Sequence, residues 1–123
     1  MSKTVLIADD EPNIVISLEY LLQREGYHVL VARDGQEALD TVDLMRPDLV
    51  LLDVMLPKVS GFEVCQKLRA NPSLNRMRIL MLTAKGRDVE MSKGMALGAD
   101  AYITKPFSTQ DLLAQIRAQL EAG

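Results

Sequence analysis

Apolar residues form five short runs along the chain, separated by longer segments of mixed character. Three of the runs are apolar at nearly every position, whereas a strand with one solvated face alternates apolar and polar residues. Continuous runs of this length predict strands that are buried on both faces, as in a parallel sheet covered by helices. The predicted strands cover residues 5–8, 28–31, 49–52, 79–82 and, less strongly, 101–104.

Between the runs, apolar residues recur at the three- and four-residue spacing of one helix face. Gly26 follows the first of these segments and is a typical helix stop. The segment between residues 87 and 97 predicts the weakest and most mobile helix, because its apolar positions are mostly methionine and Gly94 costs about 1 kcal/mol relative to alanine. The other stripes are Ile14, Leu18, Leu21 and Leu22; Ala38, Leu39 and Val42; Phe62, Cys65 and Leu68; and Leu112, Leu113, Ile116 and Leu120.

Three of these segments begin with a residue that can cap a helix, followed three positions later by an acidic residue. The side-chain oxygen of such a cap accepts a hydrogen bond from a free backbone N–H of the first turn, so these pairs indicate where the helices begin. The pairs are Asp34 with Glu37, Ser60 with Glu63, and Ser108 with Asp111.

The resulting order is five strand–helix repeats without a linker or a change of composition, so we expect a single domain over residues 1–123. Right-handed crossovers between parallel strands place helices on both faces of one sheet, which is an α/β doubly wound (βα)5 architecture of the flavodoxin-like type. The strand order 2-1-3-4-5 is one of two common solutions, and periodicity alone does not choose between them. In such folds, ligands bind at the carboxyl ends of the strands.

Composition excludes several functional classes. The chain has 123 residues, 48% of them hydrophobic, and a formal net charge of −3, so it lacks the basic excess of a nucleic-acid-binding domain. Its apolar runs are far shorter than the roughly 20 residues that a membrane span needs, and no signal peptide is visible. The single cysteine, Cys65, lies on a helical stripe and is expected in the core. A reducing compartment, the cytoplasm, is therefore expected.

Acidic residues gather where the first and third predicted strands end. Asp9, Asp10 and Glu11 follow the first strand, and Asp53 follows the third. If these strands are neighbours, three aspartates converge in a small cleft, where mutual repulsion and loss of water make ionisation costly. A hard divalent cation relieves that cost, and Mg²⁺ prefers carboxylate oxygens, whereas the absence of histidine and cysteine argues against zinc. Asp10 alone could instead cap the helix that follows.

Two further polar residues stand at strand ends. Thr83 follows the fourth predicted strand, and Lys105 follows the fifth. A lysine contributes a compact positive charge on a flexible stem, and a threonine hydroxyl can donate one hydrogen bond. With the carboxylates and a magnesium ion, these groups make a receptor for a phosphoryl group, whose transfer needs mainly in-line positioning and charge neutralisation. Asp53 is the candidate nucleophile, because aspartate forms acyl phosphates.

Four motifs thus occupy the ends of predicted strands. They are Ala8-Asp9-Asp10-Glu11-Pro12, Leu52-Asp53-Val54-Met55-Leu56-Pro57, Leu82-Thr83-Ala84 and Tyr102-Ile103-Thr104-Lys105-Pro106-Phe107. Each motif alone is a weak signal, but together and in this order they resemble the receiver domain of bacterial two-component response regulators. The resemblance extends from Lys3 to Leu120 and implies a chemotaxis-regulator-like fold with the strand order 2-1-3-4-5.

By this resemblance, Asp53 is the phospho-acceptor. Asp10 binds Mg²⁺ directly, Asp9 assists through water, and the backbone carbonyl of Met55 is the remaining protein ligand. Lys105 pairs with the phosphoryl group, and its bond to the following proline is cis. The side chains of Met55 and Lys85 influence access of water to the acyl phosphate in this family. An apolar Met55 cannot orient a hydrolytic water, which predicts modest self-dephosphorylation.

The resemblance also implies a switch and its partners. A sensor histidine kinase or histidine phosphotransfer protein supplies the phosphoryl group, Thr83 moves to donate a hydrogen bond to it, and Tyr102 turns inward. The face made by the fourth helix, fifth strand and fifth helix then changes shape, and an output domain or partner protein reads it. Such a domain catalyses its own phosphorylation and dephosphorylation and is not a conventional turnover enzyme.

The segment from Leu51 to Pro57 is most similar to the branch of transcription factors with winged-helix DNA-binding domains, whose members form homodimers through charged pairs on that same face. A phosphorylation-dependent homodimer would follow, but only part of the charge set is present, so we do not expect the branch-typical pairs to form completely. The retained charges are Lys93, Asp100 and Arg117, and the uncharged residues at positions that usually carry charge are Met91, Ala101 and Gln115.

Two alternatives from other functional classes remain open. A magnesium-dependent aspartyl phosphatase of the haloacid-dehalogenase type carries a second aspartate two residues after its nucleophile, where this chain has Met55. A flavodoxin-like FMN-binding protein needs a loop rich in serine, threonine and glycine after the first strand, whereas the acidic residues here would repel a phosphate. Turnover of a phosphomonoester and the colour of the purified protein would distinguish them.

Overall fold

Strands and helices alternate along the chain in the computed structural model, which describes residues 2–84 and 88–122. Each predicted strand is present and extends one to three residues beyond the predicted run. The elements are β1 (Thr4–Ala8), α1 (Pro12–Arg24), β2 (His28–Ala32), α2 (Gly35–Met45), β3 (Leu49–Asp53), α3 (Gly61–Arg69), the 3-10 helix η1 (Pro72–Leu74), β4 (Arg78–Ala84), α4 (Asp88–Ala96), β5 (Ala101–Lys105) and α5 (Thr109–Ala122).

The strands pair in parallel in the order β2-β1-β3-β4-β5. The predicted doubly wound order 2-1-3-4-5 is therefore confirmed, and the switch point of the sheet lies between β1 and β3. The register places Ala8 opposite Leu52 and Thr83 opposite Thr104. The polar residues at or just after these positions therefore stand together at the carboxyl edge of the sheet.

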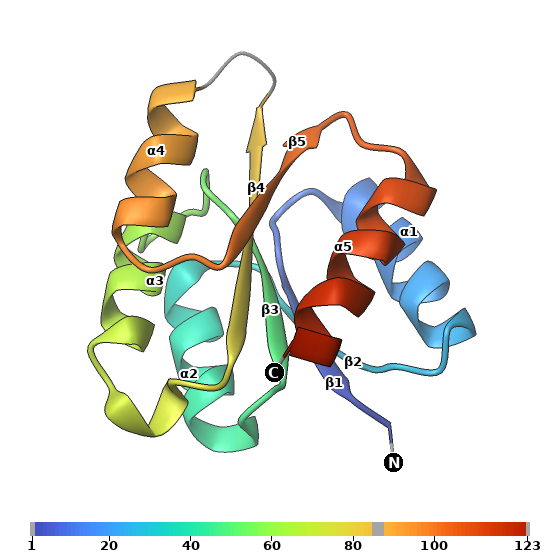
Figure 1. Cartoon of the computed structure of the whole chain (residues 1–123), viewed down its shortest axis with the longest axis horizontal. Helices are drawn as coiled ribbons and strands as arrows, with labels where there is room; N and C mark the ends of the chain where they lie inside the picture. Colours follow the sequence, from blue (N-terminus) through green and yellow to red (C-terminus); the bar gives the residue numbers. More distant parts are fainter. Residues whose placement is uncertain (1, 85–87, 123) are drawn as a thin grey trace.

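Helices cover both faces of the sheet, α1 and α5 on one face and α2, α3 and α4 on the other (Figure 1). Successive strand residues point to opposite faces. In β1 and β3, Leu6 and Val50 belong to the core cluster that includes α2 and α3, whereas Val5 and Leu49 belong to the cluster that includes α1 and α5. Since both faces are buried, the strand sequences are continuously apolar.

The predicted capping residues all start their helices. Each capping oxygen accepts a hydrogen bond from the backbone N–H three residues later. The bonds run from Glu37 N to Asp34 Oδ1 (2.8 Å), from Glu63 N to Ser60 Oγ (3.2 Å) and from Asp111 N to Ser108 Oγ (3.0 Å). Helix α1 differs, because its N-cap is Glu11 and no side chain caps it. Asp10 is therefore not a helix cap, and its carboxylate is available to bind a ligand at the carboxyl edge of the sheet.

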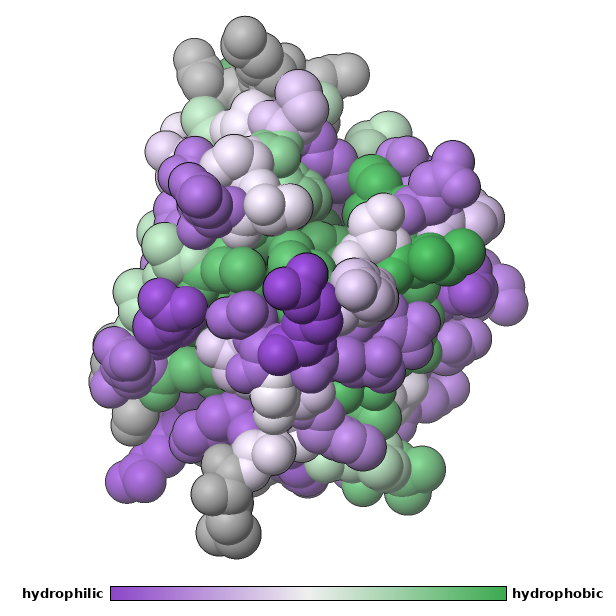
Figure 2. Space-filling model, turned by 90° about the vertical axis from the view of Figure 1, so that its right-hand side faces the viewer, coloured by the Kyte–Doolittle hydropathy of each residue, from purple (hydrophilic) through white to green (hydrophobic). Residues whose placement is uncertain are grey.

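Helix α1 buries a slightly different set of residues from the predicted stripe. Val15 joins Leu18 and Leu22 in the core, whereas Ile14 and Leu21 are only half-buried. The two half-buried side chains line a mainly apolar groove of about 450 Å³ beside the start of α5. Figure 2 views this side of the molecule and shows exposed apolar side chains among hydrophilic ones. The apolar face of α1 is thus wider than the surface it packs against.

Asp100 ties three elements together just before β5. Its carboxylate accepts hydrogen bonds from Arg69 Nη2 (2.5 Å), from Arg78 Nη1 (3.3 Å) and from the backbone N–H of Ile79 (2.8 Å). Arg69 also donates through Nε to the carbonyl of Gly98 (2.8 Å). The cluster therefore joins α3, the start of β4 and the connection from α4 to β5.

Cys65 is fully buried in the core, as expected, and burial raises the pKa of its thiol.

Among the described residues, no helix combines the length and the apolar character that crossing a membrane requires.

Candidate functional site

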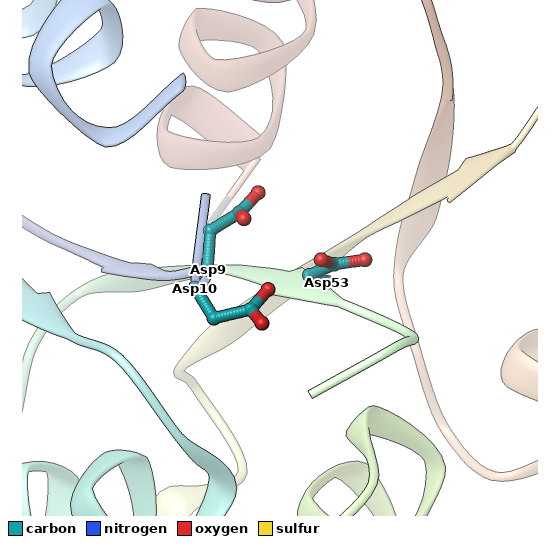
Figure 3. Close-up of side chains that lie close together, drawn as sticks. All are labelled: Asp9, Asp10 and Asp53. Carbon is teal, nitrogen blue, oxygen red and sulfur yellow. The ribbon is translucent and has the colours of Figure 1, made fainter. Parts of the chain in front are cut away.

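Three carboxylates meet at the carboxyl edge of the sheet. Asp9 and Asp10 follow β1, and Asp53 ends β3, so the adjacency of these two strands brings the acids together (Figure 3). One oxygen of each lies within 4.8 Å of the others. Asp9 and Asp53 are buried, whereas Asp10 is exposed. The predicted convergence is therefore present, with one carboxylate open to solvent and two beneath it.

Backbone hydrogen bonds orient the two buried carboxylates. Asp9 Oδ1 accepts from the N–H of Glu11 (2.9 Å), and Asp53 Oδ1 accepts from the N–H of Met55 (3.2 Å). In both cases the chain turns just after a strand and donates back to the side chain two residues earlier. The second oxygen, Oδ2, of each aspartate is left free to meet a cation.

Lys105 supplies a cation to these oxygens. Its Nζ lies 3.0 Å from Asp9 Oδ2, 3.4 Å from Asp53 Oδ2 and 3.8 Å from Glu11 Oε1. Because β4 separates β5 from β3, only a long side chain at the end of β5 can span this distance. Of the carboxylates around Lys105, Glu11 is the one for which no role was predicted from the sequence, although it directly follows Asp9 and Asp10.

Burial and neighbouring charges shift the pKa values of two groups in the cleft. Burial raises the pKa of the Asp53 carboxyl, and the nearby charge of Asp9 adds to that effect, whereas Lys105 and the Met55 N–H oppose it. Burial works to lower the pKa of Lys105, but the hydrogen bond to Asp9 and the surrounding carboxylates outweigh it and raise the pKa. Within residues 2–84 and 88–122, Lys105 is the only cation in contact with these carboxylates, so residual negative charge remains there for a divalent cation to neutralise.

The donor set fits magnesium. Asp9, Asp10 and Asp53 offer only hard carboxylate oxygens. Asp10 is exposed, so an ion bound to it could also keep water molecules as ligands. The carbonyl of Met55 lies in the loop after β3, while the side chain of that residue is exposed. No histidine or cysteine belongs to the cluster in the described part of the chain. These ligands match a small ion that keeps several waters.

Thr83 and Tyr102 lie on neighbouring strands. Thr83 is fully buried near the end of β4, and its Oγ1 finds no hydrogen-bond partner among the described residues. Tyr102 lies on β5, is 39% exposed and borders a hollow against α5. The Lys105–Pro106 peptide bond is cis, as the resemblance implied. Lys85 lies outside the described residues.

Comparison with known proteins identifies the family. The model of the response regulator receiver domain matches residues 5–117 of the chain. The chain belongs to this family. The general function of a receiver domain is to accept a phosphoryl group, and its acidic pocket binds Mg²⁺. The family also implies a histidine kinase as a partner. The comparisons give no support to the haloacid-dehalogenase-type phosphatase.

Individual relatives agree with this assignment. The receiver domain is 48% identical over 120 residues to the alkaline phosphatase synthesis transcriptional regulatory protein PhoP of Bacillus subtilis. The match covers 98% of this chain and 49% of that protein. It therefore spans about half the length of this curated relative. A putative response regulator from Chloroflexus aurantiacus is 36% identical and superposes with a TM-score of 0.94, covering 98% of this chain and 99% of the other.

A third relative carries a metal. The receiver domain of the sensor histidine kinase PA1611 of Pseudomonas aeruginosa is 26% identical, has a TM-score of 0.90 and covers 98% of this chain and 99% of its own. That protein holds a magnesium ion coordinated in its active site cleft.

The charges retained on the α4-β5-α5 face have partners within the chain. Asp100 is held by two arginines, as described above. Lys93 Nζ lies 4.6 Å from the centre of the Phe62 ring, and Arg117 Nη2 lies 3.6 Å from Glu25 Oε1 on the loop after α1. Lys93 therefore contacts α3, and Arg117 contacts the residue that ends α1, so neither charge lacks a partner within the described chain. A homodimer through this face would have to exchange internal pairs for external ones.

Proposed function

We propose that this receiver domain takes its phosphoryl group on Asp53, from a phosphohistidine of a sensor histidine kinase or of a histidine phosphotransfer protein. The observation that carries the proposal is the meeting of Asp9, Asp10 and Asp53 with Lys105 at one edge of the sheet. Mg²⁺ would be held by the carboxylates and the carbonyl of Met55. When bound, it supplies positive charge that the cleft lacks.

The chemistry follows from the position of Asp53. An oxygen of its carboxylate attacks phosphorus, and the phosphorus–nitrogen bond breaks with its electron pair going to the imidazole, which leaves as the neutral ring after protonation. Asp53 is buried and held by a single backbone N–H, so its orientation is set before the donor arrives. Lys105, 3.4 Å from Asp53 Oδ2, is placed to pair with an oxygen of the transferred group.

Titration with beryllofluoride and Mg²⁺, followed by NMR, tests this assignment. Beryllofluoride mimics a phosphoryl group on a carboxylate without transferring one. We expect Mg²⁺ alone to shift signals around the three aspartates, and beryllofluoride to cause a further shift at Asp53, Thr83 and Lys105 only when Mg²⁺ is present. Shifts that cluster elsewhere, or that appear equally in the Asp53→Asn variant, would exclude Asp53 as the acceptor.

Thr83 is proposed as the first element of the response. Its buried hydroxyl has no partner among the described residues, and the oxygens of an acyl phosphate on Asp53 would accept its hydrogen bond. Movement of Thr83 leaves space that Tyr102, on the adjacent strand, would fill by turning inward. The α4-β5-α5 face would then change shape for an output domain or another protein to read. A cytoplasmic location fits such a partner and a buried free thiol.

Thr83→Val is expected to stabilise the unphosphorylated domain and to uncouple it from phosphorylation. Valine has nearly the same shape and removes a buried hydroxyl that has no hydrogen-bond partner in the described part of the chain, so the free energy of unfolding should rise by about 1 kcal/mol. Urea unfolding measures this, with Thr104→Val on the neighbouring strand as the matched control. If the variant is destabilised, or if Tyr102 still responds to beryllofluoride, Thr83 does not have this role.

Met55 is expected to influence how long the phosphoryl group persists. Its exposed, apolar side chain cannot orient a water molecule by hydrogen bonding. Met55→Asn and Met55→Glu should therefore change the rate of dephosphorylation, while the unfolding free energy stays the same because the side chain packs little. The decay of phosphorylated protein after removal of the donor measures the rate. Equal decay in all three proteins would contradict the prediction.

A further inference from the structure

The loop between β3 and α3, residues 54–60, carries Met55 and folds back against the start of α2. The N–H of Gly35, the first residue of α2, donates to the carbonyl of Pro57 (3.1 Å). Lys58 adopts a left-handed conformation with φ of 67°, and its Nζ lies 3.5 Å from Asp34 Oδ2. The loop is therefore bound to the β2–α2 connection by one backbone hydrogen bond and one ion pair.

Gly35 leaves no room for a side chain at this contact. A Cβ atom built on Gly35 would lie 1.8 Å from the carbonyl oxygen and 2.6 Å from the carbonyl carbon of Val59. Both are backbone atoms, which cannot turn aside as the end of a flexible side chain can. Gly35 does not have a positive φ, so glycine is required here for close approach and not for backbone conformation.

The other end of the loop is held in the same way. A Cβ atom on Gly61 would lie 2.2 Å from the carbonyl oxygen of Asp53, and the N–H of Gly61 donates to the carbonyl of Val54 (3.0 Å). Gly61 thus packs against the backbone of the proposed acceptor itself. The carbonyl of Met55 lies on the part of the loop between these two close contacts.

We propose that Gly35 is a positioning residue for the metal site, acting through the loop that carries the Met55 carbonyl. The inference rests on the proposed function, because it takes that carbonyl as a ligand. Mg²⁺ demands near-ideal octahedral geometry, so a small displacement of one ligand lowers affinity. A side chain at Gly35 pushes Val59 outward and carries the loop away from Asp9, Asp10 and Asp53, although Gly35 itself touches none of them.

Calorimetric titration of Mg²⁺ into the wild-type protein, Gly35→Ala and Gly94→Ala tests the proposal. Gly94 is the matched control, since its Cβ would meet Met81 Cγ at 3.4 Å, an ordinary contact with a flexible side chain. We expect Gly35→Ala to weaken Mg²⁺ binding by about tenfold or more, which is the usual effect of disturbing groups that support metal ligands. Gly94→Ala should bind like the wild type.

The outcomes separate this inference from the function on which it rests. If the wild-type protein binds Mg²⁺ and a folded Gly35→Ala protein binds it equally well, Gly35 has only a structural role and the inference is wrong. If the wild-type protein does not bind Mg²⁺, the proposed function fails, and this inference fails with it.

Amide exchange in the wild-type protein provides a second measurement, which holds even if Gly35→Ala does not fold. Tethering Met55 to Mg²⁺ would steady the loop that accepts the hydrogen bond of Gly35. Exchange of the Gly35 amide with solvent should therefore slow when Mg²⁺ is added, while that of Gly94 stays constant. An unchanged Gly35 rate, with a shifted Met55 signal, would overturn the proposal.

Discussion

Replacing Asp53 by asparagine is expected to abolish phosphorylation of the folded domain. Asparagine keeps the size and the hydrogen bond from the Met55 N–H, but its amide is not a nucleophile toward phosphorus. Incubation with acetyl phosphate and Mg²⁺ should add one phosphoryl group to the wild-type protein and none to the variant, as read by intact mass. Asp10→Asn is the control, because it should slow the reaction without removing the acceptor.

The same substitution should make the domain more stable at neutral pH when Mg²⁺ is absent. Burial raises the pKa of Asp53, so the ionised carboxylate opposes folding above the ordinary aspartate pKa. For a group whose pKa is raised on folding, the favourable contribution is present at low pH and is lost as pH rises through the folded pKa. The stability gain of Asp53→Asn should therefore shrink in acid. A variant less stable than the wild type at neutral pH would contradict this reading.

Lys105→Met is expected to destabilise the domain strongly and to slow phosphorylation. The ammonium group lies 3.0 Å from Asp9 Oδ2, and Asp9 is completely buried. Removing Lys105 leaves this buried carboxylate without its cation and with only the hydrogen bond from the Glu11 N–H among the described contacts, which costs roughly 3 kcal/mol. Urea unfolding at neutral pH without Mg²⁺ measures the loss. Lys58→Met is a suitable control, because the Lys58 side chain is 70% exposed, so solvent screens its pair with Asp34 and the pair should contribute little.

Two conditions should change the effect of Lys105→Met in known directions. Because the pKa of Lys105 is raised, its contribution is present at neutral pH and is lost only in alkali, beyond the ordinary lysine pKa. Adding Mg²⁺ should restore part of the stability, since a bound cation takes over neutralisation of the aspartates and favours the folded state. If Mg²⁺ gives the variant no more stability than it gives the wild type, the lysine and the ion do not share the same carboxylates.

Local patterns were sufficient to predict the strands, most helix starts and the acidic residues of the cleft. The continuous apolar runs follow from burial on both faces, and the capping oxygens of Asp34 and Ser60 act on the backbone within one turn. Local patterns did not predict the strand order, since periodicity within a segment does not report which strand lies beside which. The expectation that β1 and β3 are neighbours came only from the resemblance.

Contacts between segments that are far apart in the chain could not be predicted from the sequence. Asp100 was interpreted as a charge on an exposed face, but Arg69 and Arg78 reach it from α3 and β4. Val15 was missed because the width of the buried face of α1 depends on what packs against it. The need for glycine at position 35 arises from the backbone of Val59, and the residues next to Gly35 in the sequence give no sign of such an approach.

The most direct test is to locate the phosphoryl group chemically. The wild-type protein is incubated with acetyl phosphate in Mg²⁺ or in chelator, then treated with borohydride, which reduces an acyl phosphate of aspartate to homoserine. We predict homoserine at position 53 alone, and only in the sample that contained Mg²⁺. Homoserine at another aspartate, or equal reduction in the chelated sample, would contradict the central claim that the clustered acids hold a dication so that Asp53 can accept phosphorus.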